Sequence, residues 1–249
     1  MSGFPLLVQS KTDTHCRDIE QWSDSDEEFS EIFRHCVKNK DKCSLARDGA
    51  TAVQLEQSVW DLIERLKYQP IIVGDQILDD RALRISIVLN LYLPRTWPDF
   101  TRALDMLING DADEAFLTRV FKLDAGNAAF DIDVNEFQAV MAIRGSDRSV
   151  RAGSLDNLIP FLEKVANTSK VFDGPENFIH IPSAQWKFNA KERYEGDFQV
   201  TPREPVLVIG NTWDGLTPLR SAHNVSSGFE GSVVLEVNGH GVSEFALLN

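Results

Sequence analysis

The feature that most constrains the fold is a change of pattern from residue 205 onward. The continuous apolar, β-branched run Pro205-Val-Leu-Val-Ile-Gly210 is typical of a buried parallel strand. Thr217-Pro218 predicts a helix N-cap followed by proline at the first helical position, with the helix reaching about Ser227. A second strand is predicted at 232–237. Strand, helix and strand within about thirty residues form a βαβ unit, so we expect the two strands to be parallel neighbours.

The preceding part of the chain predicts helices, because apolar residues recur there at a spacing of three and four. We interpret each apolar stripe as core packing. Residues 171–204, rich in proline, asparagine and charge, are predicted to form an irregular connection. The sequence therefore divides into a helical region at 1–170, the connection at 171–204 and a C-terminal α/β segment at 205–249. The helices are expected at 27–36, 54–67, 80–91, about 98–110, 116–121 and 154–170, the last capped by Ser154.

The formal net charge of −13 argues against two classes of partner. Nucleic acids and anionic lipid surfaces both require a basic protein surface, so we expect neither as a partner. No apolar run approaches the length of a membrane span. The N-terminal residues lack the basic and apolar regions of a secretory signal, and we expect a cytoplasmic location for the chain as given.

Two features of the sequence are instead typical of secreted proteins. Cys36 and Cys43 flank a short, polar, lysine-rich loop, and a local disulfide there would require an oxidising compartment. Asn167-Thr-Ser and Asn224-Val-Ser are sequons for N-glycosylation, a motif that also arises by chance. These features hint at a secreted ancestry.

Asp214 and His240 are the candidate catalytic residues. Asp214 lies four residues beyond the first predicted strand, and His240 lies three beyond the second. Parallel neighbours bring both loops to one edge of the sheet, where ligands of such sheets bind. There the carboxylate could hold the tautomer of an imidazole that takes and returns a proton. Either residue alone would be interpreted as a turn or surface residue, but their matching positions favour function.

The C-terminal residues resemble a known family. Gly210-Asn-Thr-Trp-Asp-Gly-Leu-Thr-Pro218 and Val237-Asn-Gly-His-Gly241 are similar to the C-terminal region of tripeptidyl-aminopeptidase-like α/β-hydrolases, serine peptidases of the prolyl-iminopeptidase type. The secreted fungal branch is the most similar. The resemblance implies that Asp214 is the triad acid, that His240 is the triad base, and that residues 1–170 form the family's helical lid, or cap. It also implies hydrolysis of an ester, amide or peptide bond, with a role in fungal secondary-metabolite biosynthesis as one expectation.

The chain departs from the family at informative positions. Gly145 and Ser183 stand where the family often has cysteines. The half that carries the Gly-x-Ser-x-Gly nucleophile elbow is absent from this sequence. Ser146 and Ser154 directly follow a glycine, and Ser243 lies two residues after Gly241, but none has the second glycine of the elbow. We therefore expect an α/β chain with a partial α/β-hydrolase fold, in which a helical lid region precedes the last βαβ of the parallel sheet.

Two functions remain open from the sequence. The first is a serine hydrolase whose nucleophile comes from missing sequence or a second chain, with a small-molecule or peptide substrate. The second is a catalytically inactive truncated homologue that acts as a binding or partner module. A two-stranded sheet leaves its edges open, so we also expect self-association or a partner at the sheet edge. No cofactor or metal is expected, because the five histidines show no metal-ligand spacing.

Overall fold

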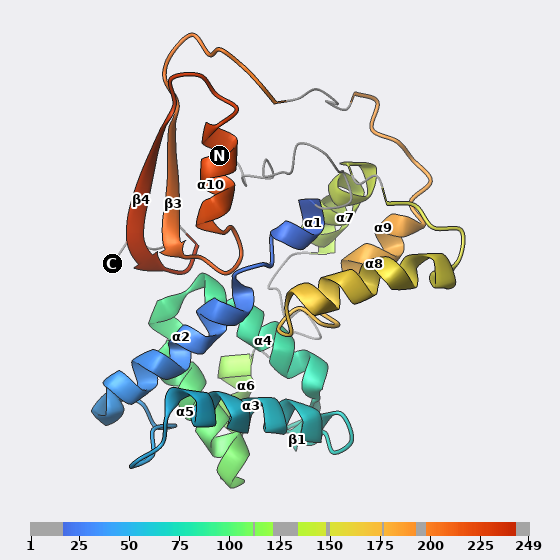
Figure 1. Cartoon of the computed structure of the whole chain (residues 1–249). Coiled ribbons are helices and arrows are strands. Elements are labelled where there is room, and N and C mark those ends of the chain that lie inside the picture. Colours follow the sequence, from blue (N-terminus) through green and yellow to red (C-terminus); the bar gives the residue numbers. More distant parts are fainter. Residues whose placement is uncertain are drawn as a thin grey trace. The chain divides into compact units, whose positions relative to one another are not determined.

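The computed structural model describes residues 17–242 apart from residues 112 and 176 and the segments 122–133, 148–149 and 193–197. The interpretation of Ser243 falls outside the described residues. No helix within the described ranges is both long enough and apolar enough to cross a membrane. In chain order the elements are α1 (Arg17–Glu20), α2 (Ser25–Lys38), η1 (Lys40–Lys42), α3 (Ala52–Leu66), β1 (Ile71–Val73), β2 (Gln76–Leu78), α4 (Asp80–Tyr92), η2 (Pro94–Thr96), α5 (Trp97–Asn109), α6 (Glu114–Phe121), α7 (Val134–Asp147), α8 (Leu155–Thr168), α9 (Asn177–Ala184), β3 (Leu207–Trp213), α10 (Leu219–Ser226) and β4 (Val233–His240) (Figure 1).

The chain divides into two compact units, 26–132 and 1–25 with 133–249. This division differs from the predicted boundary at residue 170. Helices α7 and α8 both pack against α9, which groups residues 133–170 with the C-terminal segment. The 171–204 segment is also not irregular throughout, because it contains α9. Its prolines, one of them inside the helix at Pro182, hide α9 from a reading based on composition.

Unit 26–132 contains the predicted helices except the one expected at 154–170, which forms as α8 in the other unit. The α3 stripe is confirmed, since the side chains expected to face the core are at most 5% exposed. Thr51 and Gln54 form a reciprocal capping box, which explains why α3 begins two residues before the predicted start. Helices α2, α4, α5 and α6 also form where the pattern places them. The fully buried side chains of this unit include Phe29, Phe33, Phe100, Leu83, Ile87 and Leu91.

The sequence reading missed a short β-hairpin in the same unit. β1 and β2 pair antiparallel, with Val73 opposite Gln76, so Gly74 and Asp75 alone form the turn. Gly74 has φ +63°, a left-handed conformation that glycine adopts without strain. The signal was present in the sequence, because a Gly-Asp pair between two apolar, β-branched runs is typical of a two-residue hairpin.

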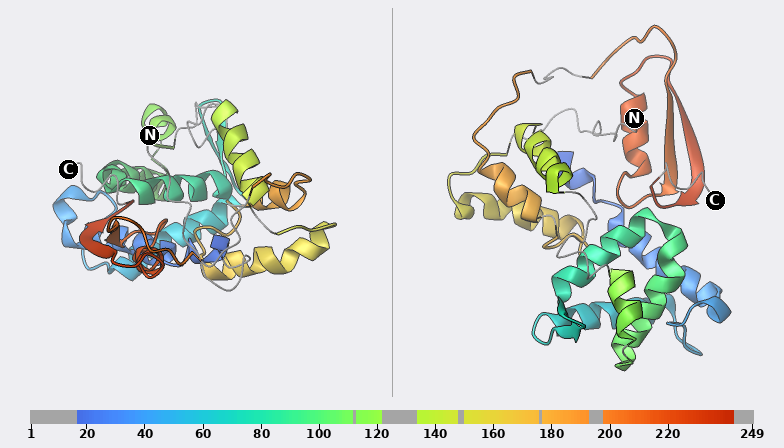
Figure 2. Two further views of the ribbon diagram at one scale, coloured as in Figure 1. Left: turned by 90° about the horizontal axis from the view of Figure 1, so that it is seen from above. Right: turned by 180° about the vertical axis from the view of Figure 1, so that it is seen from behind.

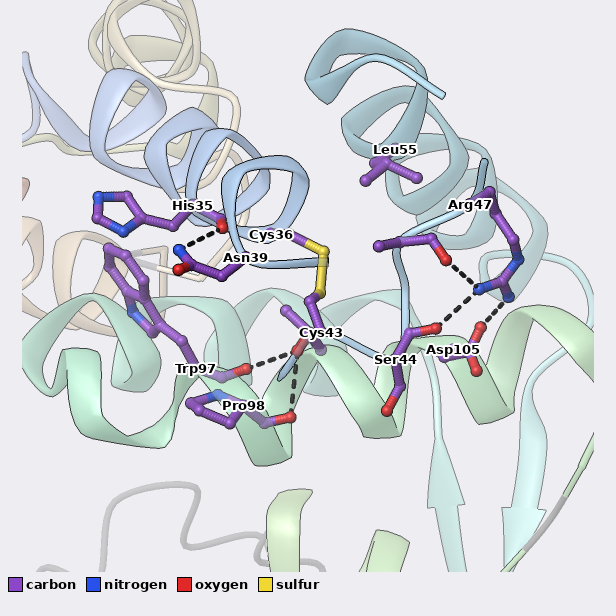
Figure 3. The surroundings of a disulfide bond; sticks show 12 residues. His35, Cys36, Asn39, Cys43, Ser44, Arg47, Leu55, Trp97, Pro98 and Asp105 are labelled. Carbon is purple, nitrogen blue, oxygen red and sulfur yellow. Dashed lines mark hydrogen bonds and ion pairs between the residues drawn. A yellow bond between two sulfur atoms is a disulfide. The ribbon is translucent and has the colours of Figure 1, made fainter. Parts of the chain in front are cut away.

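Cys36 and Cys43 form a disulfide, with their Cα atoms 5.2 Å apart (Figure 3). Both cysteines are buried, Cys36 at the end of α2 and Cys43 just after η1. Arg47 holds the loop that follows, because it donates a 2.7 Å hydrogen bond to the Ser44 carbonyl and pairs with Asp105 of α5 (Figure 3). The bridge therefore closes a local loop inside unit 26–132.

In the other unit, α7, α8 and α9 form a small helical group. Leu158 of α8 and Ala184 of α9 are buried together with Ala152. Ser154 stands at the N-cap position, as predicted, but its side chain makes no capping hydrogen bond to the backbone. Helix α7 was not predicted, because the apolar residues in its sequence are not confined to one helical face. Trp22 stacks on Phe172, with ring centroids 3.8 Å apart.

β3 and β4 are parallel neighbours, which confirms the predicted pairing. α10 lies along one face of this two-stranded sheet (Figure 2). Gly210 permits the close approach, since a Cβ there would lie 2.8 Å from Cδ1 of Leu219 and 3.0 Å from Cβ of Ala222. The boundaries shift from those predicted, because α10 begins at Leu219 with Pro218 as its N-cap, and β4 extends through His240.

The opposite face of this sheet is not buried, which corrects the expectation of a buried strand. Four aliphatic side chains in two register pairs, Leu207 with Val233 and Ile209 with Leu235, are 39–60% exposed. We call these four residues the open face. An apolar run of this kind normally has elements on both sides, and within the described residues α10 supplies only one of them.

Candidate active site

The candidate acid and base lie at the same end of the β3–β4 sheet. Asp214 follows β3 directly, and His240 is the last residue of β4. Trp213 pairs with His240 in the parallel register, after an irregularity between Asn211 and Trp213. The structure therefore places the two predicted residues after, or at, the ends of adjacent strands. His240 belongs to the strand itself rather than to a loop beyond it.

The carboxylate of Asp214 is buried and held by its own turn. One oxygen, Oδ1, accepts hydrogen bonds from the backbone N–H groups of Leu216 at 3.0 Å and Thr217 at 2.8 Å. The Thr217 hydroxyl donates to Oδ2 at 2.6 Å. Asp214 is only 1% exposed, and these three donors offset the cost of burying a charged group. They also fix the direction in which the carboxylate points.

The side chain of His240 is half-buried and lies against Trp213. The two rings stack with centroids 5.9 Å apart and planes 14° from parallel. A backbone hydrogen bond also joins the two strand ends, because the N–H of Gly241 donates to the carbonyl of Trp213 at 2.9 Å. Gly241 has φ +79°, which glycine accommodates without strain. Trp213 therefore restrains the imidazole on one side.

Asn211 is a site residue that sequence reasoning missed. Its side-chain amide nitrogen donates a 2.7 Å hydrogen bond to the carbonyl of Gly241, the residue after His240. Asn211 is fully buried, and its Oδ1 has no hydrogen-bond donor within the described part of the chain. The signal was an amide side chain at the end of an otherwise apolar run, where an unpaired polar group is costly. Asn211 therefore ties the end of β3 to the segment that follows β4.

Residues near the start of the described chain hold the turn after Asp214. Ser25 donates a hydrogen bond from its hydroxyl to the carbonyl of Gly215, and Ser25 is fully buried. Asp24 forms an ion pair with Arg220 of α10. The described residues 17–25 group with the C-terminal segment. The turn 214–217 is thus restrained by its own backbone and by a segment distant in sequence.

The serines considered as nucleophiles do not occupy elbow positions where the structure describes them. Ser146 lies inside α7 and accepts a 3.2 Å hydrogen bond from the indole nitrogen of Trp186, while Ser154 stands before α8. Ser243 is outside the described residues. In the described ranges, the two strand-to-helix connections, 79 and 214–218, contain no serine.

The hydrogen-bond partners of Asp214 indicate the chemistry that its carboxylate can support. The described hydrogen-bond partners of Asp214 are N–H and O–H donors, which suit an ionised carboxylate. The buried carboxylate follows β3 and the imidazole ends the adjacent parallel strand β4. A carboxylate and an imidazole at such positions are the residue types that make the orienting pair of nucleophilic hydrolases.

Comparison with known proteins agrees with this reading of the C-terminal segment. Residues 176–246 match the model of a family described as TAP-like protein, of the α/β-hydrolase type. The match contains β3, α10 and β4 with Asp214 and His240. It supports a TAP-like α/β-hydrolase C-terminal region and a hydrolase-like α/β fold family for this part of the chain. No curated protein matches the chain.

Proposed function

We propose that this chain contributes the acid, Asp214, and the base, His240, to the catalytic triad of a serine hydrolase. The observation that carries the proposal is their position at the same end of the parallel strands β3 and β4, inside the segment that matches the TAP-like family. The fold in this proposal is a partial α/β-hydrolase fold, with β3–α10–β4 as the last βαβ of a larger sheet.

The proposed mechanism follows from the groups in place. His240 accepts the proton of a serine hydroxyl as its oxygen attacks the carbonyl carbon of an ester, amide or peptide bond. His240 then gives that proton to the leaving group, and the acyl group is transferred to water in a second cycle. Asp214 accepts a hydrogen bond from the ring N–H that faces away from the serine, which fixes the tautomer. Leu216 and Thr217 keep the carboxylate in position for that hydrogen bond.

The serine of this triad comes from outside residues 1–249 in our proposal. Two structural features support this assignment. No serine stands at a described strand-to-helix connection, and the open face leaves four aliphatic side chains in solvent. We propose that the polypeptide bearing the serine elbow covers the open face and extends the sheet from an edge of β3 or β4.

The experiment recovers the tagged protein from the cells that make it and treats it with a fluorophosphonate probe. The proposal expects a labelled serine in the recovered material, outside residues 1–249, whose labelling rate falls about 10³-fold or more in His240→Ala. The control is His223→Ala, since His223 lies on α10 and pairs with Glu236 at 3.0 Å. A labelled serine within residues 1–249, or labelling that is equal in the wild type and in His240→Ala, would contradict the proposal.

The substrates to test are set by the resemblance to the fungal branch. They are short peptides and aminoacyl arylamides on one side, and the esters and amides of secondary-metabolite biosynthesis on the other. His240→Ala should abolish turnover of whichever class the assembled enzyme accepts, while His223→Ala should leave it unchanged.

A second candidate function is a binding module that associates with a second copy of itself. The open face favours this candidate, because both β3 and β4 are edge strands among the described residues and carry unpaired backbone groups next to an apolar surface. Sedimentation of the purified chain tests it. Self-association that disappears in Ile209→Lys/Leu235→Lys, together with no labelled serine in the cell-derived material, would favour this module over the hydrolase.

A further inference from the structure

Asn167 lies in the sequon Asn167-Thr168-Ser169 at the end of α8. Asn167 is exposed, and helix α8 ends one residue later at Thr168, with Ser169 as the extended C-cap. The amide that would carry a sugar therefore stands at the surface, next to the point where the helix ends. A helix terminus unwinds more readily than a helix interior.

Ser169, which supplies the required hydroxyl, is folded away in the structure. It is 1% exposed, and its Oγ accepts a 3.3 Å hydrogen bond from the N–H of Phe172. An enzyme that needs this hydroxyl must read it before the chain folds. N-linked glycosylation has this order, because the sequon is modified as the chain emerges into the secretory compartment, and the glycan then requires a surface position for the asparagine alone.

The disulfide is an independent observation that points to the same compartment. Buried disulfides such as Cys36–Cys43 persist in oxidising environments and are rare in the cytosol. The bridge lies in unit 26–132, and the sequon lies in the other unit, so neither feature depends on the other. The bridge favours the secretory route over the cytoplasmic location expected from the N-terminal residues.

The other sequon, Asn224-Val225-Ser226, has a less suitable position. Asn224 is only partly exposed and lies within α10, which packs on β3. The hydroxyl of Ser226 lies 2.6 Å from that of Ser232, and Ser232 also donates to the Ser226 carbonyl. A glycan at Asn224 would stand beside this junction between α10 and β4, whereas Asn167 faces solvent.

A glycan at Asn167 would also cover exposed apolar side chains of α8. Leu155 and Ile159 are i,i+4 neighbours on the surface of α8, and Asn167 lies about two turns beyond Ile159. Leu155 is 58% exposed and Ile159 41% exposed. Twelve residues of helix span roughly 18 Å, a length that a branched oligosaccharide covers. A glycan at Asn167 would shield these two apolar side chains from water.

We propose that Asn167 is a site of N-linked glycosylation. In the reaction, the side-chain amide nitrogen of Asn167 forms an N-glycosidic bond with the anomeric carbon of a lipid-diphosphate-linked oligosaccharide. The lipid diphosphate leaves, and the amide nitrogen gives up one proton. The donor lipid and the transferase belong to the secretory compartment in which the disulfide forms.

The test translates the full chain, behind a heterologous secretion leader, into endoplasmic-reticulum microsomes. Glycosylation is read as a mass that peptide-N-glycosidase removes, leaving aspartate at the modified position. We expect the wild type and Asn224→Gln to carry the glycan, and Asn167→Gln and Ser169→Ala to lack it. Ser169→Ala keeps the asparagine, so its loss of the glycan separates sequon use from any effect of changing residue 167.

Two results would overturn the proposal. One is a wild-type chain that enters the microsomes without gaining a glycan at Asn167, with a glycosylated reporter protein as the positive control for the lumen. The other is a glycan that persists in Asn167→Gln and disappears in Asn224→Gln. The glycan can be detected on a folded or an unfolded chain, so a variant that fails to fold still gives a result.

Discussion

The side chain of Asn211 donates a 2.7 Å hydrogen bond to the backbone carbonyl of Gly241, and so connects the end of β3 to the residue that follows His240. Because Asn211 is fully buried, loss of its side chain leaves the Gly241 carbonyl without this donor. The bond therefore matters for where the imidazole stands, although Asn211 itself is no acid or base.

Replacement of Asn211 by alanine should destabilise the β3–β4 pairing by about 1–3 kcal/mol, the cost of a buried polar group without its partner. Native-state hydrogen exchange at the amides of β3 and β4 measures this locally. Asn238→Ala is the matched control, since Asn238 lies on β4 with an exposed side chain, and it should change these values by less than about 0.5 kcal/mol. Equal effects of the two substitutions would mean that the hydrogen bond from Asn211 to Gly241 does not stabilise the pairing of β3 and β4.

Gly210→Ala should loosen α10 from the sheet. The added Cβ would lie 2.8 Å from Leu219 and 3.0 Å from Ala222, so the helix must move outward, at a cost of about 1–3 kcal/mol. Gly153→Ala is the control, because nothing lies within 4 Å of a Cβ there. Hydrogen exchange of α10 amides should accelerate in the first variant and stay unchanged in the second. Unchanged protection in Gly210→Ala would mean that α10 does not pack closely on β3.

Gly145→Ala tests the packing that stands where the family often has a cysteine pair. A Cβ at Gly145 would lie 2.7 Å from the ring of Trp186. We expect a loss of about 1–3 kcal/mol in the stability of the α7–α9 group. The loss should shrink in the background of Trp186→Leu, because the smaller side chain leaves room. A double-mutant cycle with additive effects would show that Gly145 and Trp186 are not in contact.

Removal of the disulfide should destabilise unit 26–132. With a sequence separation of 7, loop-closure entropy predicts a loss of about 2–3 kcal/mol in Cys36→Ser/Cys43→Ser. Urea unfolding with and without reductant measures the effect. The wild type should shift on reduction, and the double variant should not. A wild type that is insensitive to reductant would mean that the two thiols are not bridged.

The sequence predicted the parts of this structure that follow from periodicity. The β3–α10–β4 order, the parallel pairing and most helices of 26–132 come from apolar spacing and helix-ending residues. Asp214 and His240 could be placed near one sheet edge because strand ends in a βαβ unit coincide. Their catalytic roles remain a prediction.

What the sequence could not supply are the contacts that depend on three-dimensional proximity. The tether from Asn211 to Gly241 crosses thirty positions and has no periodic signature. The stack of Trp213 on His240 depends on an irregular register between Asn211 and Trp213. No sequence pattern predicts this irregularity. The division at residues 26 and 132 follows from how α7 and α8 pack on α9, and α9 contains a proline that conceals it.

The central claim is that Asp214 fixes the tautomer of His240. Nitrogen-15 NMR of labelled histidine in the purified chain tests it, with the His240 signals assigned by their absence in His240→Gln. We predict that neutral His240 carries its proton on Nδ1 in the wild type and switches to Nε2 in Asp214→Asn. That variant keeps an oxygen for the N–H groups of Leu216 and Thr217. The same tautomer in both proteins, or a wild-type ring protonated on Nε2, would contradict the account.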